Sequence, residues 1–140
     1  MSEVRFVVGD ADACLRERLD EEITAFNAAV TGHHDGHVLT VAVRGDDGDL
    51  HAGLCGWTWG GCGYIELLWV RDDQRGSGLG TRLLAIAEAE IRRRGCDRVA
   101  LSTHSFQSPG FYARLGYTEC GRTPGYPHCH DDIHLMKQLR

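Results

Sequence analysis

The sequence contains no hydrophobic run long enough to cross a membrane, and this absence excludes a first class of proteins. A membrane-spanning helix needs about 20 consecutive apolar residues, whereas polar or charged residues interrupt every apolar stretch of this chain. The first ten residues also lack the basic segment and apolar core that are typical of a secretory signal. We therefore expect a cytoplasmic protein that has no membrane partner.

Lysine, linker sequence and paired cysteines are also scarce. Lys137 is the only lysine among 15 basic residues, and the net charge is −5, whereas general nucleic-acid binders carry a basic face. The six cysteines include no CxxC pair, so we expect reduced thiols. The tail His128-Cys129-His130 with His134 offers a zinc site as an alternative, but alternate residues of a strand point to opposite faces, so we expect no metal. No repeat, low-complexity run or Pro/Ser-rich linker divides the chain. These absences predict one domain over residues 1–140 with no nucleic-acid partner.

Hydrophobic periodicity, in contrast, is clear along most of the chain. Apolar residues at three- and four-residue spacing predict one amphipathic helix or two short ones over residues 13–30, and helices over residues 79–91 and 111–115. Alternating or continuous apolar runs predict strands over residues 5–8, 38–44, 50–59, 64–70, 99–103, 117–122 and 130–139. The order β-α-β-β-β-α-β-α-β-β predicts an α/β fold, with a mixed sheet of about six to seven strands and helices on both faces.

A glycine-rich loop lies between the apolar strand over residues 64–70 and the helix that begins near Leu79. It reads Gln74-Arg75-Gly76-Ser77-Gly78-Leu79-Gly80-Thr81. The first turn of a helix has backbone N–H groups without intrahelical partners, and glycines let a ligand approach them. With the helix dipole and Arg75, such a loop binds a phosphate or pyrophosphate. It fits neither GxGxxG nor GxxxxGK[ST], and the alternative is a tight turn.

Two motifs resemble those of one known family. Arg75, Gly78 and Gly80 fill the pattern R-x-x-G-x-G, which resembles the acyl-CoA signature of the GNAT N-acetyltransferase superfamily. The segment over residues 111–117 is similar to the family's FYxxLGF/Y block and lies at the expected distance downstream. The run over residues 105–112, with Tyr126-Pro127 and His130, resembles a bacterial subgroup of small single-domain members.

The resemblance implies a sheet that is splayed in the middle and acetyl-CoA as cosubstrate. Backbone amides of the glycine-rich loop would bind the pyrophosphate, and the strand before it would bind the pantetheine arm and acyl carbonyl through its backbone. The implied cofactor-binding residues are Leu68, Val70, Arg75, Gly76, Ser77, Gly78, Gly80, Thr81, Ser105 and Ser108. Ser105 stands where many members have Asn, which puts that contact in doubt.

Acyl transfer to an amine also needs a proton donor for the leaving thiolate. Tyr112 stands at the tyrosine position of the family motif, and the resemblance implies that it is this acid. A phenol stays protonated at neutral pH and can still give its proton to sulfur. The alternative is that Tyr112 is a packing aromatic beside Phe111.

An alkyl amine must lose a proton before it attacks the thioester. Glu66 is the only charge in the strand YIELLWV, and strand alternation predicts that it shares a face with Tyr64 and Leu68. We interpret it as the candidate base. The alternatives are a structural partner for an arginine such as Arg71 or Arg122, and a water that takes the proton.

The acceptor site is the least defined. Trp57 and Trp59 alternate along one strand, so we predict that they share a face and contact the acceptor, or else belong to the core. Asn27 and His130 are further candidate substrate-binding residues. The predicted function is transfer of acetyl from acetyl-CoA to a primary amine of a small or amino-acid-like molecule, by a monomer or homodimer. The alternative is a non-catalytic acyl-CoA-sensing module.

Overall fold

The computed structural model describes residues 3–139, which fall into two compact units, one ending at His34 and one beginning at Asp35. The first unit contains α1 (Ala13–Thr31), so the helix predicted over residues 13–30 is confirmed. The Asp12 carboxylate accepts the Leu15 N–H at 3.0 Å, and Gly32 ends the helix in the left-handed conformation. No helix of the described residues is long and apolar enough to span a membrane.

The strand predicted over residues 5–8 is wrong. Residues 3–12 form no regular element. A strand exists only where its N–H and C=O groups pair with a neighbour, and the described residues of the first unit include no second strand. The expectation of one domain over residues 1–140 stays a prediction.

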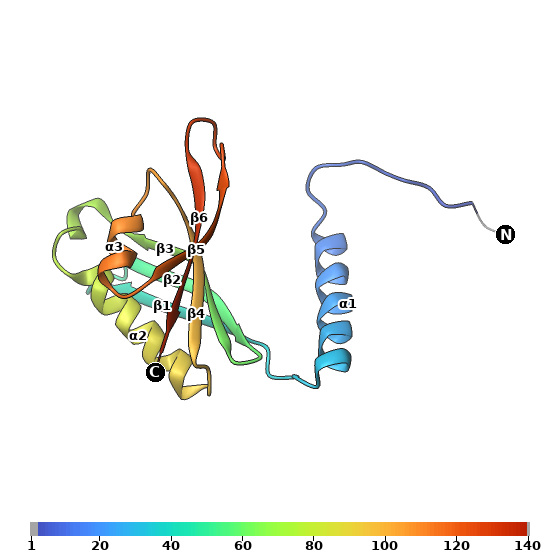
Figure 1. Cartoon of the computed structure of the whole chain (residues 1–140), viewed down its shortest axis with the longest axis horizontal. Coiled ribbons are helices and arrows are strands. Elements are labelled where there is room, and N and C mark those ends of the chain that lie inside the picture. Colours follow the sequence, from blue (N-terminus) through green and yellow to red (C-terminus); the bar gives the residue numbers. More distant parts are fainter. Residues whose placement is uncertain (1–2, 140) are drawn as a thin grey trace. The chain divides into compact units, whose positions relative to one another are not determined.

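The second unit contains a six-stranded mixed sheet (Figure 1). In the sheet the strands stand in the order β1-β2-β3-β4-β6-β5, and only β3 and β4 are parallel. This arrangement confirms the predicted mixed sheet. The strands are β1 (His37–Arg44), β2 (Leu50–Trp59), β3 (Cys62–Val70), β4 (Arg98–His104), β5 (Thr118–Pro124) and β6 (Asp131–Gln138).

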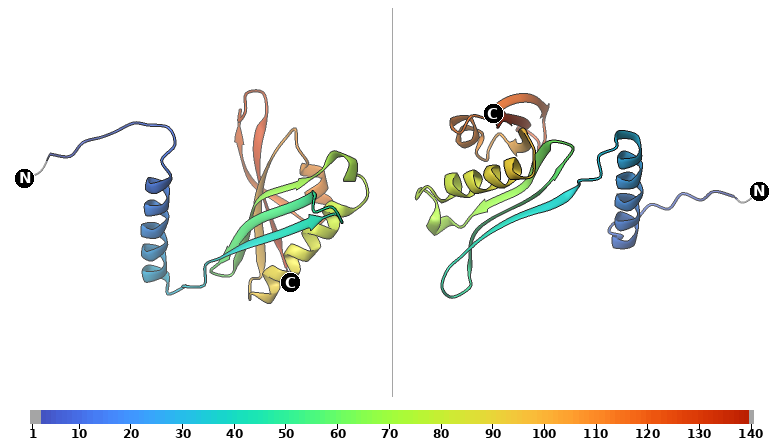
Figure 2. Two further views of the ribbon diagram at one scale, coloured as in Figure 1. Left: turned by 180° about the vertical axis from the view of Figure 1, so that it is seen from behind. Right: turned by 90° about the horizontal axis from the view of Figure 1, so that it is seen from below.

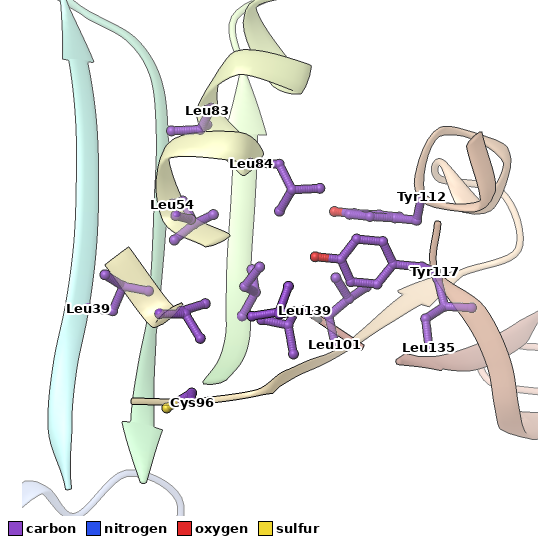
Figure 3. Packing of buried hydrophobic residues seen from close by; sticks show 14 of the residues in the cluster. Leu39, Leu54, Leu83, Leu84, Cys96, Leu101, Tyr112, Tyr117, Leu135 and Leu139 are labelled. Carbon is purple, nitrogen blue, oxygen red and sulfur yellow. The ribbon is translucent and has the colours of Figure 1, made fainter. Parts of the chain in front are cut away.

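Helices α2 (Leu79–Arg93) and α3 (Pro109–Arg114) pack on one face of this sheet (Figure 2). A short 3₁₀ helix, η1 (Asp72–Gln74), precedes α2, which makes the crossover between the parallel strands. The largest fully buried side chains are Leu39, Leu83, Leu84, Ile91 and Val99. They lie between α2 and the strands, and Tyr112 of α3 and Tyr117 pack at the edge of the same core (Figure 3). Within this unit the helices therefore cover one face, which we call the inner face; the opposite face is the outer face.

The sheet is splayed between β3 and β4. Their pairing runs only from Cys62 opposite Arg98 to Ile65 opposite Leu101. Beyond this point β3 stays paired with β2, whereas β4 stays paired with β6. The splay that the resemblance implies is thus present, and it begins at Glu66 and Ser102.

A β-bulge in β3 marks the same point. Gly56 lies opposite Ile65, and the preceding residue Cys55 lies opposite Leu67, so Glu66 has no partner in β2. The extra residue changes which side chains share a face. Leu68 lies opposite the buried Leu54 on the inner face, and Tyr64 stacks on Trp57 on the outer face, with ring centroids 4.8 Å apart.

The expectation that Glu66 shares a face with both Tyr64 and Leu68 is therefore wrong. It assumed an uninterrupted alternation, and the bulge shifts the alternation by one residue. Trp57 and Trp59 do share a face, as predicted, because β2 alternates regularly through Thr58, which is buried.

The bulge in β3 requires a residue without a side chain at Gly56 of β2, and this requirement can be tested. A Cβ at Gly56 would overlap the Tyr64 carbonyl oxygen, whereas a Cβ at Gly53 in the same strand would meet its nearest atom at 3.5 Å. We expect Gly56→Ala to lower the free energy of unfolding by about 2 kcal/mol or more, and Gly53→Ala to be neutral or slightly stabilising. Urea unfolding of both variants checks this. Equal stabilities would contradict the bulge.

Candidate active site

A cleft of about 980 Å³ opens where β3 and β4 part. Its walls are the end of β3, the glycine-rich loop with the start of α2, the end of β4, the start of α3, and two side chains near β6. Because it passes between two strands, it reaches both the inner and the outer face of the sheet. The predicted site residues that line it are Glu66, Leu68, Val70, Arg75, Gly76, Gly78, Gly80, Thr81, Ser108 and Tyr112.

The glycine-rich loop offers a row of unused backbone donors. Within the described part of the chain, no acceptor bonds to the N–H groups of residues 76–81; the first helical bond of α2 runs from Arg82 N–H to Gly78 O at 3.1 Å. Gly76 and Gly78 have φ of 76° and 82°, a region that favours glycine. Gly80 packs closely, since a Cβ there would lie 3.4 Å from Phe111. The loop is thus a cradle for an anion at the positive end of α2.

Two side chains of the loop hold its shape. The Arg75 Nε donates to Val70 O at 2.9 Å, and its guanidinium pairs with Asp72 at 2.7 Å. The Ser77 hydroxyl donates to Gln74 O at 2.6 Å. We expected both residues to bind the cofactor, Arg75 through its charge as well. The structure commits both side chains to the loop itself, and the Arg75 N–H donates to Asp72 O at 3.3 Å. Arg75 still lines the cleft, whereas Ser77 is not among its lining residues.

The free edge of β3 supplies further backbone groups. Arg71 N–H donates to His51 O of β2 at 2.8 Å. In an extended strand, alternate residues direct their N–H and C=O groups to opposite edges. Val70 and Leu68 therefore direct theirs toward the cleft, where Arg75 occupies the Val70 carbonyl and the Val70 N–H remains available.

Tyr112 and Tyr117 differ in what holds their hydroxyl groups. The Tyr117 hydroxyl donates to Oε2 of the buried Glu88 at 2.8 Å, and the Lys137 ammonium donates to Oε1 at 2.8 Å. Tyr112 packs edge-on against the Tyr117 ring at 5.7 Å and lines the cleft, and no described residue hydrogen-bonds its hydroxyl. Burial raises the pKa of both phenols, so both stay protonated at neutral pH. Of these two phenols, Tyr112 alone lines the cleft.

Glu66 stands exposed at the splay point and lines the cleft. The two arginines weighed as its structural partners are engaged elsewhere. Arg71 binds Asp73 at 2.6 Å, and Arg122 binds Glu119 and Asp131, each at 2.6 Å. Neither arginine is therefore a partner of Glu66, and within residues 3–139 no lysine or arginine forms an ion pair with its carboxylate.

The sequence reasoning missed the residues that line the cleft on the β4 and β6 side. The His104 Nδ1 donates to the Tyr126 carbonyl oxygen at 3.1 Å and lies 3.7 Å from Asp132, and the ring stacks on Phe106 with centroids 5.5 Å apart. Ser102 lines the cleft one step closer to the splay point. The available signal was the alternation of β4, in which Ser102 and His104 interrupt an apolar strand, but their partners are more than 20 residues away.

Several expected residues do not reach the cleft. Trp57 and Trp59 lie on β2 and are not among its lining residues. His130 packs edge-on behind Phe106 at 4.9 Å. The Ser105 hydroxyl accepts the Asp131 N–H at 3.0 Å, which ties the residue to β6. Asn27 belongs to the first unit, so its role stays a prediction.

The described residues contain no group of three or more metal-ligating side chains. All six cysteines are free. Burial raises the pKa of the Cys62 and Cys96 thiols, which keeps them protonated and poorly nucleophilic. The polar and titratable side chains that line the cleft include Glu66, Ser102, His104, Tyr112 and Asp132.

Comparisons with known proteins agree on one family. The model of the acetyltransferase (GNAT) family matches residues 6–117. An acetyltransferase of Agrobacterium fabrum is 36% identical over 84% of this chain and 87% of its own length. The blasticidin-S acetyltransferase of Streptomyces morookaense is 42% identical over 68% of this chain and 71% of its own. A crystal structure from Agrobacterium tumefaciens, provisionally assigned as an acetyltransferase, has a TM-score of 0.89 and 33% identity, over 96% of this chain and 99% of that chain.

The buried carboxylate behind Tyr112 generates a stability prediction. Glu88→Leu removes the partner of Lys137 and of the Tyr117 hydroxyl, and we expect it to cost about 3 kcal/mol because a half-buried ammonium is left unpaired. Adding Lys137→Met should recover part of this loss. Chemical unfolding of the two single variants and the double variant measures the coupling. A double variant whose loss equals the sum of the single losses would contradict it.

Proposed function

The chain belongs to the acetyltransferase (GNAT) family and is an acyltransferase, and from this premise we propose that it transfers acetyl from acetyl-CoA directly to a primary amine of a small molecule. The observation that carries the proposal is the row of N–H groups of residues 76–81 that no described residue accepts. Backbone donors in a row at a helix N-terminus match the oxygens of a diphosphate.

The free edge of β3 fits the rest of the cosubstrate. The pantetheine arm has amide groups, and Leu68 and Val70 direct backbone groups of the same kind toward the cleft. The Val70 N–H, which remains available beside the loop, would polarise the acyl carbonyl and stabilise the negative charge that develops on its oxygen. Because Arg75 occupies the Val70 carbonyl, the acyl oxygen meets a donor at this position and no competing acceptor.

Tyr112 is proposed as the acid that protonates the departing thiolate. Tyr112 lines the cleft that also contains the cradle, and burial raises its pKa. The packing alternative is compatible with this role, since the ring is held between Phe111 and Tyr117 and that contact fixes where the hydroxyl points.

The acceptor would enter from the outer face. The carboxylates of Glu66 and Asp132 line the cleft, and no lysine or arginine of the described chain pairs with either. The exposed rings of Phe106 and Tyr126 both contact the His104 ring, and His104 Nδ1 lies 3.7 Å from the Asp132 carboxylate. Carboxylates and aromatic faces bind organic cations. A relative named as a blasticidin-S acetyltransferase also supports a small-molecule acceptor. The amine proton would pass to Glu66 or to a water.

Coenzyme binding tests the cradle. Gly78→Ala places a side chain at φ 82°, so we expect the Kd for CoA and acetyl-CoA to rise about tenfold or more, as a strain of about 1–2 kcal/mol predicts. Gly48→Ala is the matched control, because φ is 84° in a turn far from the cleft. Titration calorimetry compares both variants. Equal Kd values, or wild-type protein that binds NADH but not CoA, would remove the proposal.

Thiol release tests the acid. We expect Tyr112→Phe to lower kcat about 10²-fold and to leave the KM for acetyl-CoA unchanged. Tyr117→Phe is the matched control, since its hydroxyl is committed to Glu88; it should lose stability and keep kcat. Normal turnover by Tyr112→Phe contradicts its role. CoA binding without thiol release from any amine would instead favour the acyl-CoA-sensing module.

A further inference from the structure

A serine and a histidine face each other at the point where the sheet opens. Ser102 is the first residue of β4 beyond the last pair with β3, and it lines the cleft. His134 lies directly opposite it in β6, and the Ser102 hydroxyl oxygen is 2.8 Å from His134 Nδ1. Both side chains lie on the outer face, because Leu101, Thr103, Ile133 and Leu135 between them are buried in the core. The pair thus stands on the side from which the acceptor would enter.

The second ring nitrogen of His134 also has a hydroxyl partner. Nε2 lies 3.4 Å from the Thr123 hydroxyl oxygen of β5. A neutral imidazole that donates from Nε2 to Thr123 has its lone pair on Nδ1. In this tautomer the Ser102 hydroxyl donates to Nδ1, and its oxygen keeps lone pairs that can accept a proton. Gly121, opposite His134 in β5, leaves room for the ring, since a Cβ there would lie 3.7 Å from Cδ2.

We propose that Ser102 and His134 together accept the proton of the reacting amine, with Ser102 touching the amine and His134 acting through it. This inference rests on the proposed amine acetylation. As the amine nitrogen bonds to the acetyl carbon and the C–S bond breaks, one N–H proton passes to the Ser102 oxygen. The Ser102 hydroxyl proton passes to His134 Nδ1, and Tyr112 gives its proton to the thiolate. Water then takes the proton from the imidazolium and returns one to Tyr112, so that no net charge accumulates.

The charged groups around His134 fit an imidazolium intermediate. On β6 the carboxylate of Asp132 lies on the same face, two residues away, and it has no lysine or arginine partner in the described chain. On β4 the other titratable group of this face is His104, which is next to Asp132. On β5 the Cys120 thiol donates to the His134 carbonyl oxygen at 3.4 Å and does not face the ring. One carboxylate therefore offsets the positive charge that forms on the ring.

Glu66 and Ser102 differ in how firmly they are placed. Glu66 is the bulged residue, it is exposed, and no described side chain holds its carboxylate. Ser102 is held by a regular strand and by a 2.8 Å hydrogen bond. General-base catalysis depends on a fixed geometry. Glu66 then serves to attract the cationic amine toward the cleft, and the Ser102–His134 pair takes the proton.

The pH dependence of kcat/KM tests the proposal, measured with two acceptor amines of different pKa. A limb of the profile whose midpoint changes with the pKa of the amine reports the titration of the substrate. In wild type we expect a second limb that is the same for both amines; activity falls as pH drops through it, because a protonated imidazole accepts no proton. Ser102→Ala and His134→Gln should each lower kcat about 10²-fold, abolish this limb, and leave the Kd for CoA unchanged.

Matched variants separate this outcome from structural damage. His37→Gln, which replaces an exposed histidine of β1 outside the cleft, should keep the wild-type profile. The proposal is overturned if His134→Gln retains this limb. It is also overturned if Glu66→Gln loses the limb while Ser102→Ala keeps full activity. In both cases the proposed acetylation of an amine would still stand. Wild-type protein that binds CoA and acetylates no amine overturns the proposed function, and the proposal with it.

Discussion

The structure of the site depends on the point at which β3 stops pairing with β4. β3 stays paired with β2 along its length, but it pairs with β4 over only four residues. A bulge at Glu66 turns the chain at this point, and Gly56 makes room for it. The two strands then leave backbone groups of Leu68 and Val70 without strand partners. Such groups are costly when they are shielded from water and unpaired, so an opened sheet favours a ligand that carries amides of its own.

The cradle next to this opening is preorganised by the chain itself. Arg75 ties the loop to the end of β3, and Ser77 ties it to η1. These contacts hold six N–H groups in one row before any ligand arrives, which reduces the ordering cost of binding. An overall charge of −5 does not oppose this local anion site, because aligned backbone dipoles act at short range.

Local patterns predicted the parts of the site that are contiguous in the chain. The glycine-rich loop, Tyr112 and the crossover helix each follow from residues close in sequence, and their positions were predicted correctly. The face of Glu66 was not, because a bulge is decided by the register of two strands and leaves little trace in either one. Ser102 and His134 were missed as a pair because 32 residues separate them, and only the order β4-β6 brings them together. The strand expected over residues 5–8 failed for the same reason, since pairing is not a local property.

The two faces of the sheet divide the proposed chemistry between them. The cradle and Tyr112 serve the inner side of the cleft, where the leaving thiol would be, whereas Ser102, His134 and Asp132 stand on the outer side, where the amine would arrive. Proton donor and proton acceptor are then separated by the sheet, so the phenol and the imidazole do not simply exchange a proton with each other. The same separation lets the outer residues of β4 and β6 change with the acceptor while the loop and β3 keep the coenzyme. In the proposed reaction, specificity for the amine would depend on side chains, and binding of the coenzyme on the backbone.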